Sequence, residues 1–151
     1  MLPGGARFRK GSGRLQPQVA AAAANRYAGG MYTVRVEDGF AAAHFLTRYH
    51  GRCERLHGHN YKVLVTASGP SLNDGGLLLD FGAMKGALRT VVQELDHTSL
   101  NEHEAFKDGC PSAERIARFV FEKMRAAMPE APLTLVEVFE TDRNRATYAP
   151  D

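Results

Sequence analysis

The chain contains no tryptophan and only two cysteines among its 151 residues. Cys53 and Cys110 are too few to build a disulfide framework, which favours two free thiols in a reducing, cytoplasmic environment. The sequence has no apolar run near the roughly 20 residues that a membrane-spanning helix needs, so nothing predicts a membrane protein. With 44% hydrophobic and 24% charged residues, the composition is typical of one globular domain.

Acidic residues are absent from residues 1–30, whose formal charge of +5 comes from five basic residues, Arg7, Arg9, Lys10, Arg14 and Arg26. Because the whole chain is +2, the rest of it is mildly acidic and gives no sign of nucleic-acid binding. The first 30 residues show no hydrophobic period, so we predict a disordered basic extension, with a transit peptide as the alternative. The regular pattern begins at Met31, which indicates one domain over residues 31–151.

Two stretches after Met31 have the alternation of β-strands. Tyr32, Val34 and Val36 are separated by polar residues, which predicts a strand that continues toward His44. The stretch HNYKVLVTASG repeats the alternation, and the turn residues of GPSLNDGG follow it. We expect these two strands to form an antiparallel hairpin.

Helical spacing follows the hairpin. Asp80 is expected to cap a first helix. The apolar residues of that helix are Phe81, Met84, Leu88, Val91, Val92 and Leu95. A second helix begins after CPS, carries Ile116, Val120 and Met124 on one face and ends near Pro129. The stretches LTLVEVFET and RATYAP predict two last strands, so the order is ββααββ, an α+β fold with both helices on one face of an antiparallel sheet.

The stretch CERLHGHNY, residues 53–61, places a thiol close to two imidazoles. His57 and His59 open a strand, and a spacing of two directs both side chains to the same face. His44 ends the preceding strand, so in a hairpin it can stand across from them. Three converging neutral imidazoles predict a zinc site with one coordination position left open.

Two roles for Cys53 remain open on the residues alone. As a fourth ligand it would close a structural zinc site made of one cysteine and three histidines. As a free thiol beside the metal it could move protons, since nearby positive charge lowers a thiol pKa.

The stretch ELDHTSLNE adds a second constellation after the first helix. Adjacent Asp96 and His97 could form a proton relay. A solvated aspartate beside a histidine that meets the helix dipole is the structural alternative.

Five stretches together resemble the family of 6-pyruvoyl-tetrahydropterin and 6-carboxytetrahydropterin synthases. They are FAAAHF, CERLHGHNY, LLLDFGAMK, LDHTSLN and VEVFETDRNRATY, and the resemblance covers residues 31–149. It implies the tunnelling fold, in which subunits join their sheets into a trimeric barrel and two trimers stack as a hexamer, with the active site between subunits. The expected partners are therefore copies of the same chain and a small pterin triphosphate.

The resemblance also implies roles for single residues. The zinc ligands match His44, His57 and His59, and the catalytic thiol matches Cys53. The relay matches Asp96 and His97. The pterin-binding glutamate matches Glu140, and Ser112 and Glu114 resemble part of the same pocket. Apart from the resemblance, a triphosphate needs basic residues, and Lys85, Arg143 and Arg145 are candidates that the sequence does not rank.

The C-x3-H-G-H spacing and the DF after the central strand resemble the bacterial 6-carboxytetrahydropterin synthases of queuosine and deazapurine synthesis. Such an enzyme converts 7,8-dihydroneopterin triphosphate to 6-carboxy-5,6,7,8-tetrahydropterin and releases acetaldehyde and triphosphate. Ala113 departs from the pattern, because many relatives carry a hydroxyl residue there. A 6-pyruvoyl-tetrahydropterin synthase and a non-catalytic zinc module are the alternatives. A metal-free cysteine hydrolase leaves the three histidines unexplained.

Overall fold

The computed structural model describes residues 30–151. The predicted basic extension therefore lies, apart from Gly30, outside the described residues. Within residues 30–151, no helix has both the length and the apolar character that crossing a membrane requires.

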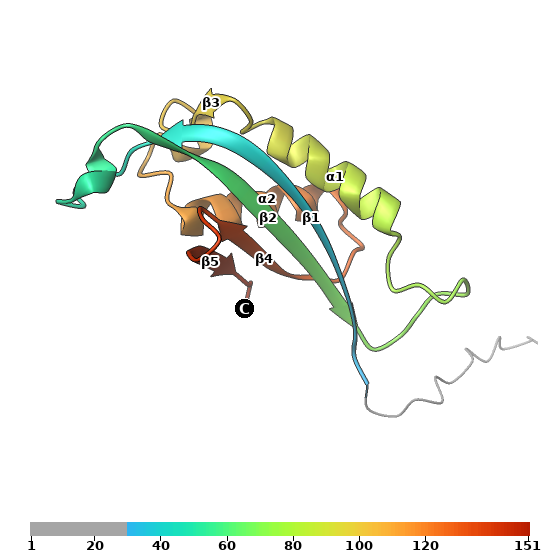
Figure 1. Ribbon diagram of the computed structural model, residues 1–151. Helices are drawn as coiled ribbons and strands as arrows, with labels where there is room; N and C mark the ends of the chain where they lie inside the picture. Colours follow the sequence, from blue (N-terminus) through green and yellow to red (C-terminus); the bar gives the residue numbers. More distant parts are fainter. Residues whose placement is uncertain (1–29) are drawn as a thin grey trace, which may run out of the picture.

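A long curved hairpin forms the centre of the sheet (Figure 1). Strands β1 (Tyr32–His44) and β2 (His57–Gly69) pair in antiparallel register over their whole length, from Tyr32 opposite Gly69 to His44 opposite His57. The strands β4 (Leu133–Phe139) and β5 (Arg145–Tyr148) extend the sheet beyond β2. The predicted hairpin and the two last strands are confirmed.

The prediction of a purely antiparallel sheet is wrong in one detail. A two-residue strand, β3 (Thr98–Ser99), pairs in parallel with Ala42 and Ala43 of β1, so the sheet is mixed and its order is β3-β1-β2-β4-β5. Two residues are too few to show the alternation on which strand prediction depends. The remaining short elements are the 3-10 turns η1 (Arg52–Glu54) and η2 (Glu104–Phe106).

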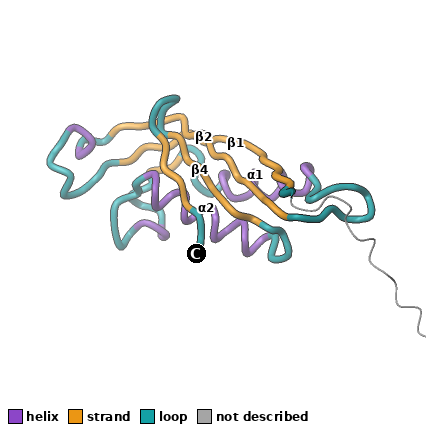
Figure 2. Tube along the Cα trace, turned by 90° about the horizontal axis from the view of Figure 1, so that it is seen from below, coloured by secondary structure: helices purple, strands orange, loops and turns teal. Residues whose placement is uncertain are grey.

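Helices α1 (Phe81–Gln93) and α2 (Ala113–Ala127) cover one face of the sheet, as Figure 2 shows. Asp80 caps α1 as predicted, because its carboxylate accepts a hydrogen bond from Ala83 N at 2.7 Å. The core lies between this helical layer and the sheet. Its largest fully buried apolar side chains are Met84, Leu88, Leu95, Leu100, Phe106, Ile116 and Met124.

The expected apolar stripe of α1 is correct except at its two ends. Phe81 is 52% exposed, because the first residue of the helix lies beyond the edge of the core. Leu95 is buried although α1 ends at Gln93, because the turn that follows the helix directs the Leu95 side chain into the core.

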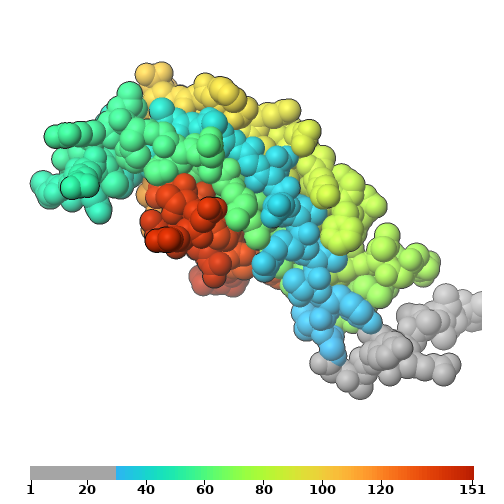
Figure 3. Space-filling model, viewed as in Figure 1, coloured from blue at the N-terminus to red at the C-terminus, as the bar shows by residue number. Residues whose placement is uncertain are grey.

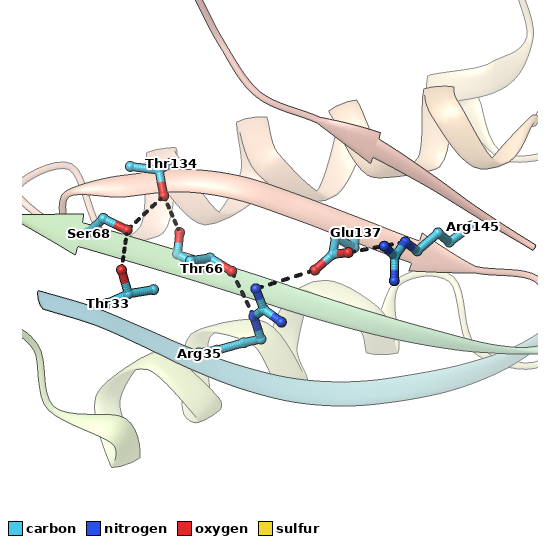
Figure 4. Close-up of polar contacts among 7 residues, drawn as sticks. All are labelled: Thr33, Arg35, Thr66, Ser68, Thr134, Glu137 and Arg145. Atoms are coloured by element: carbon cyan, nitrogen blue, oxygen red, sulfur yellow. Dashed lines mark hydrogen bonds and ion pairs between the residues drawn. The ribbon is translucent and has the colours of Figure 1, made fainter. Parts of the chain in front are cut away.

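The opposite face of the sheet carries a row of polar contacts (Figure 4). Arg35 Nε donates to Thr66 Oγ1 at 3.1 Å, and the buried carboxylate of Glu137 lies 3.6 Å from the Arg35 guanidinium and 3.4 Å from that of Arg145. Hydroxyl contacts continue the row through Thr33, Ser68 and Thr134. Because successive side chains of a strand point to opposite faces, the same strands place these polar residues on one face and core residues on the other.

Candidate metal centre and active site

Three imidazoles converge where the hairpin strands meet the loop that joins them. The register places His44 directly opposite His57, and His59 follows two residues later on the same face. Ring centroids lie 4.5 Å apart for His44 and His57, 5.2 Å for His44 and His59, and 5.0 Å for His57 and His59. One nitrogen of each ring lies within 4.8 Å of the other two. The predicted convergence is confirmed.

Backbone carbonyls select the tautomers of two of these rings. The Nδ1–H of His44 donates to Pro111 O at 2.9 Å, and the Nδ1–H of His57 donates to Arg55 O at 2.7 Å. A carbonyl only accepts, so the Nε2 atoms keep their lone pairs. His44 Nε2 is buried with no hydrogen-bond partner in the described chain, and burial lowers the pKa of His44. A metal ion binds a neutral imidazole whose Nε2 lone pair is free and whose Nδ1–H donates to another group of the protein.

Tyr61 lies next to this triad, and sequence reasoning assigned it only to a strand. Its ring stacks on Phe40 at 4.7 Å and meets His44 and His59 edge-on. Its hydroxyl is buried without a hydrogen-bond partner in the described residues, and burial raises the pKa of the phenol. The alternation of side chains along β2 places Tyr61 on the same face as His57 and His59.

A hollow of about 320 Å³ is linked to the triad through Glu140, although none of the three histidines lines it. Glu140 follows β4, and its Oε1 lies 3.9 Å from His44 Nε2. Cys53, half-buried in η1, lines the same hollow and is not one of the residues that converge as metal ligands in the described chain. The predicted Ser112 and Glu114 line it as well, so the structure brings four of the predicted residues together. The hydroxyl of Ser112 also caps α2, accepting from Arg115 N at 3.4 Å.

Asp96 and His97 line two other hollows. His97 lines one of about 520 Å³, together with β3 and with His59 of the triad, and Asp96 lines one of about 170 Å³. His97 Nδ1 is 2.9 Å from Asp96 Oδ2, so the predicted pair forms, and His97 occupies the left-handed region at φ 55°. Ala41 N donates to Asp96 Oδ1 at 2.8 Å, which with the contact to His97 lowers the pKa of Asp96. The side chain of His97 is 82% exposed. Within one chain, this pair and Cys53 line different hollows.

Cys110 is a free thiol, as predicted, and it makes hydrogen bonds to Thr47. Its Sγ accepts from Thr47 N at 2.9 Å and lies 3.0 Å from Thr47 Oγ1, contacts that lower the pKa of the thiol. Of the three candidate cations for a triphosphate, only Arg145 lines the hollow of Glu140.

Comparison with known proteins agrees with this geometry. The model of the family described as 6-pyruvoyl tetrahydropterin synthase matches residues 33–151. The 6-carboxy-5,6,7,8-tetrahydropterin synthase of Bacillus subtilis is 36% identical over 119 residues, which cover 73% of this chain and 80% of that protein. The human 6-pyruvoyl tetrahydrobiopterin synthase is 31% identical over 102 residues, which cover 65% of this chain and 70% of that protein.

Solved structures show the same fold. The 6-pyruvoyl tetrahydropterin synthase of Caenorhabditis elegans superposes with a TM-score of 0.74 at 29% identity and covers 81% of this chain and 97% of its own. The two helices over a hairpin-centred sheet are thus the architecture of that structure too. The chain belongs to the 6-pyruvoyl tetrahydropterin synthase family and is an enzyme of the lyase type found in it.

Proposed function

We propose that the protein converts 7,8-dihydroneopterin triphosphate to 6-carboxy-5,6,7,8-tetrahydropterin, with release of acetaldehyde and triphosphate, in the cytoplasmic synthesis of queuosine or a related deazapurine. The observation that carries the proposal is the hollow lined by Glu140 and Cys53, in which the carboxylate of Glu140 lies 3.9 Å from His44 Nε2 of the histidine triad. The bacterial relative named as a 6-carboxytetrahydropterin synthase supports the same substrate.

We infer that His44, His57 and His59 hold a zinc ion through their ring nitrogens. The neutral tautomer and the buried, unpartnered Nε2 of His44 fit such an ion, as does the donor set of three imidazoles. A bound zinc would supply Lewis-acid chemistry, which lowers the pKa of hydroxyl groups on the substrate side chain.

Glu140 and Cys53 divide the remaining work in this proposal. A carboxylate accepts two hydrogen bonds, which suits Glu140 to the amino and ring N–H donors on one edge of a pterin. Cys53, which lines the same hollow, would take and return a proton at the substrate side chain as its thiolate. Ser112 and Glu114 lie at the N-terminal end of α2, where they would complete the polar wall.

Asp96 and His97 would complete the proton relay for Cys53 of a neighbouring copy. Cys53 lines neither of the hollows that Asp96 and His97 line, and His97 is largely exposed, which supports a site built between subunits. The carboxylate of Asp96 would stabilise the charged imidazole while His97 exchanges its proton.

A 6-pyruvoyl-tetrahydropterin synthase is the second candidate, favoured by the similarity to the human and nematode proteins. Product analysis after incubation with dihydroneopterin triphosphate distinguishes the two reactions. The proposal expects acetaldehyde and a 6-carboxy pterin, whereas a 6-pyruvoyl pterin without acetaldehyde would favour the second candidate. Unchanged substrate in a fully zinc-loaded sample would contradict both.

A further inference from the structure

The loop of residues 45–56, which joins β1 to β2, extends at one end of the molecule (Figures 1 and 3). It carries Cys53 and also Tyr49, a large aromatic residue that is 58% exposed. The sequence motif of cysteine and histidines does not include Tyr49, so no role follows for it from the chemistry described above. An exposed aromatic ring beside a binding hollow calls for an explanation.

The backbone around Tyr49 adopts a conformation that needs support. Arg48 and His50 on either side of it lie in the left-handed region, at φ 61° and φ 58°. Residues other than glycine rarely adopt this region, because the Cβ atom crowds the backbone there. Glu54 Oε1 accepts from Tyr49 N at 3.0 Å and from His50 N at 3.1 Å. One carboxylate therefore holds the turn that presents Tyr49.

The Tyr49 ring itself packs against a glycine. A Cβ atom added to Gly51 would lie 2.6 Å from Cε1 and 2.9 Å from Cδ1 of the ring, so the ring would have to move to admit a side chain at residue 51. The ring is thus supported from one side by backbone, while the residue remains more than half exposed.

Tyr49 lines the same hollow as Glu140 and Cys53. The volume of about 320 Å³ is at the lower end of the roughly 300–1,000 Å³ of small-molecule sites, so it suits one bicyclic ring better than a ring with a triphosphate. A carboxylate and an aromatic face on one wall match a flat heteroaromatic molecule that has N–H donors on its edge and π surfaces above and below.

We propose that Tyr49 is the stacking surface for the pterin ring whose edge Glu140 binds, and that Glu54 is a positioning residue that holds Tyr49 in place. This inference rests on the pterin substrate proposed above. Glu140 would accept hydrogen bonds from the edge of the ring and Tyr49 would stack on its face, so removal of either side chain weakens binding without abolishing it.

The test is equilibrium binding of neopterin, followed by its own fluorescence, to the zinc-loaded protein and its variants. Tyr49→Ala should weaken binding about ten-fold or more, the usual effect of losing one stacking ring. Tyr49→Phe keeps the ring and should bind within about two-fold of wild type. Leu56→Ala is the matched control, because Leu56 is a 67% exposed apolar residue of the same loop that does not line the hollow.

Glu54 is tested by a pair of variants. Glu54→Gln keeps an oxygen that accepts from Tyr49 N and His50 N, so neopterin binding should stay near wild type. Glu54→Ala loses both hydrogen bonds and should approach the affinity of Tyr49→Ala, with zinc content unchanged. A double variant of Tyr49→Ala and Glu54→Ala should bind no more weakly than Tyr49→Ala alone, since Glu54 acts through Tyr49.

The outcomes separate this inference from the proposed function. Wild-type binding of neopterin together with full affinity in Tyr49→Ala would overturn the stacking role and leave the pterin function standing. Equal losses in Tyr49→Ala and Tyr49→Phe would also overturn it, because the hydroxyl and not the ring would then matter. Absence of neopterin binding by the wild-type protein would contradict the pterin function, and the role of Tyr49 with it.

Discussion

Two backbone carbonyls determine which nitrogen His44 and His57 can offer to a metal ion. Pro111 O and Arg55 O accept from the Nδ1–H groups of His44 and His57, which leaves the Nε2 lone pair of each ring available. Such outer contacts orient metal ligands and raise their basicity.

We expect about one zinc ion per chain in the wild-type protein, and its loss in His57→Ala or His59→Ala. A three-ligand site that loses one imidazole retains too little to compete for the metal. Metal analysis of the purified variants checks this, with His103→Ala as the control because His103 lies outside the triad. Full zinc occupancy in both ligand variants would mean that the metal, if present, is held elsewhere.

Cys53→Ala should keep its zinc and its melting temperature while turnover falls about 10²–10⁴-fold, the usual effect of removing a general base. The thiol lies outside the set of converging ligand atoms, so its removal leaves the metal shell intact. Zinc content and turnover are measured on the same sample. A metal-depleted variant would instead make Cys53 a fourth ligand, and a fully active one would exclude it from both roles.

Asp96 should make the stability of the protein depend on acid pH. Its pKa is lowered in the folded chain by the hydrogen bond from Ala41 N and the contact to His97. The stabilisation is therefore fully present above the unfolded pKa of about 3.9 and disappears as the pH falls through the lower folded value. Denaturation midpoints of wild type and Asp96→Asn should differ at neutral pH and converge below about pH 4. A constant difference across this range would contradict the assignment.

Much of this site could be predicted from the residues alone, for a definite reason. The period of two in a strand fixes His57 and His59 on one face, and a hairpin register brings His44 opposite. Tyr49 could not be found in the same way, because its position depends on left-handed backbone at Arg48 and His50, which no periodicity encodes.

At the scale of elements, the helices are fixed by caps and by one apolar stripe each. The stripe of α2 buries Ile116, Val120 and Met124 as the spacing predicts. The short β3 could not be predicted, since its pairing comes from the turn after α1, where His97 N donates to Ala41 O at 2.6 Å. That tertiary contact places the Asp96 and His97 pair at the edge of the sheet.

Asp80→Ala should lower the free energy of unfolding by about 1 kcal/mol, the usual cost of losing an N-cap. The carboxylate satisfies Ala83 N, one of the amide groups that an α-helix leaves unpaired at its start. Chemical denaturation compares this variant with Asp74→Ala, an exposed aspartate in the preceding turn. Equal stability of the two variants would show that the cap contributes nothing measurable.

At the scale of the whole molecule, the sheet has two open sides. β3 pairs with only two residues of β1, which leaves the stretch from Tyr32 to Ala41 without a neighbour beyond it among the described strands, and β5 ends the other side. Natural proteins pair or cover such edges, and closed rings of copies are one solution. The sequence predicts the strands but not what covers their free edges, because the alternation along a strand says nothing about its neighbours.

We expect a closed oligomer, a trimer or hexamer, whose active site takes Cys53 from one copy and His97 from the next. Cys53→Ala and His97→Ala should each be nearly inactive. Co-expressed in equal amounts, they should regain about a quarter of the wild-type rate, since a random mixture restores that share of two-chain sites. Light scattering gives the size of the oligomer. The control for expression level is wild type co-expressed with a chain that carries both substitutions. A stable monomer, or no recovery in mixed oligomers, would place the relay and the thiol in the same chain or remove the relay from the reaction.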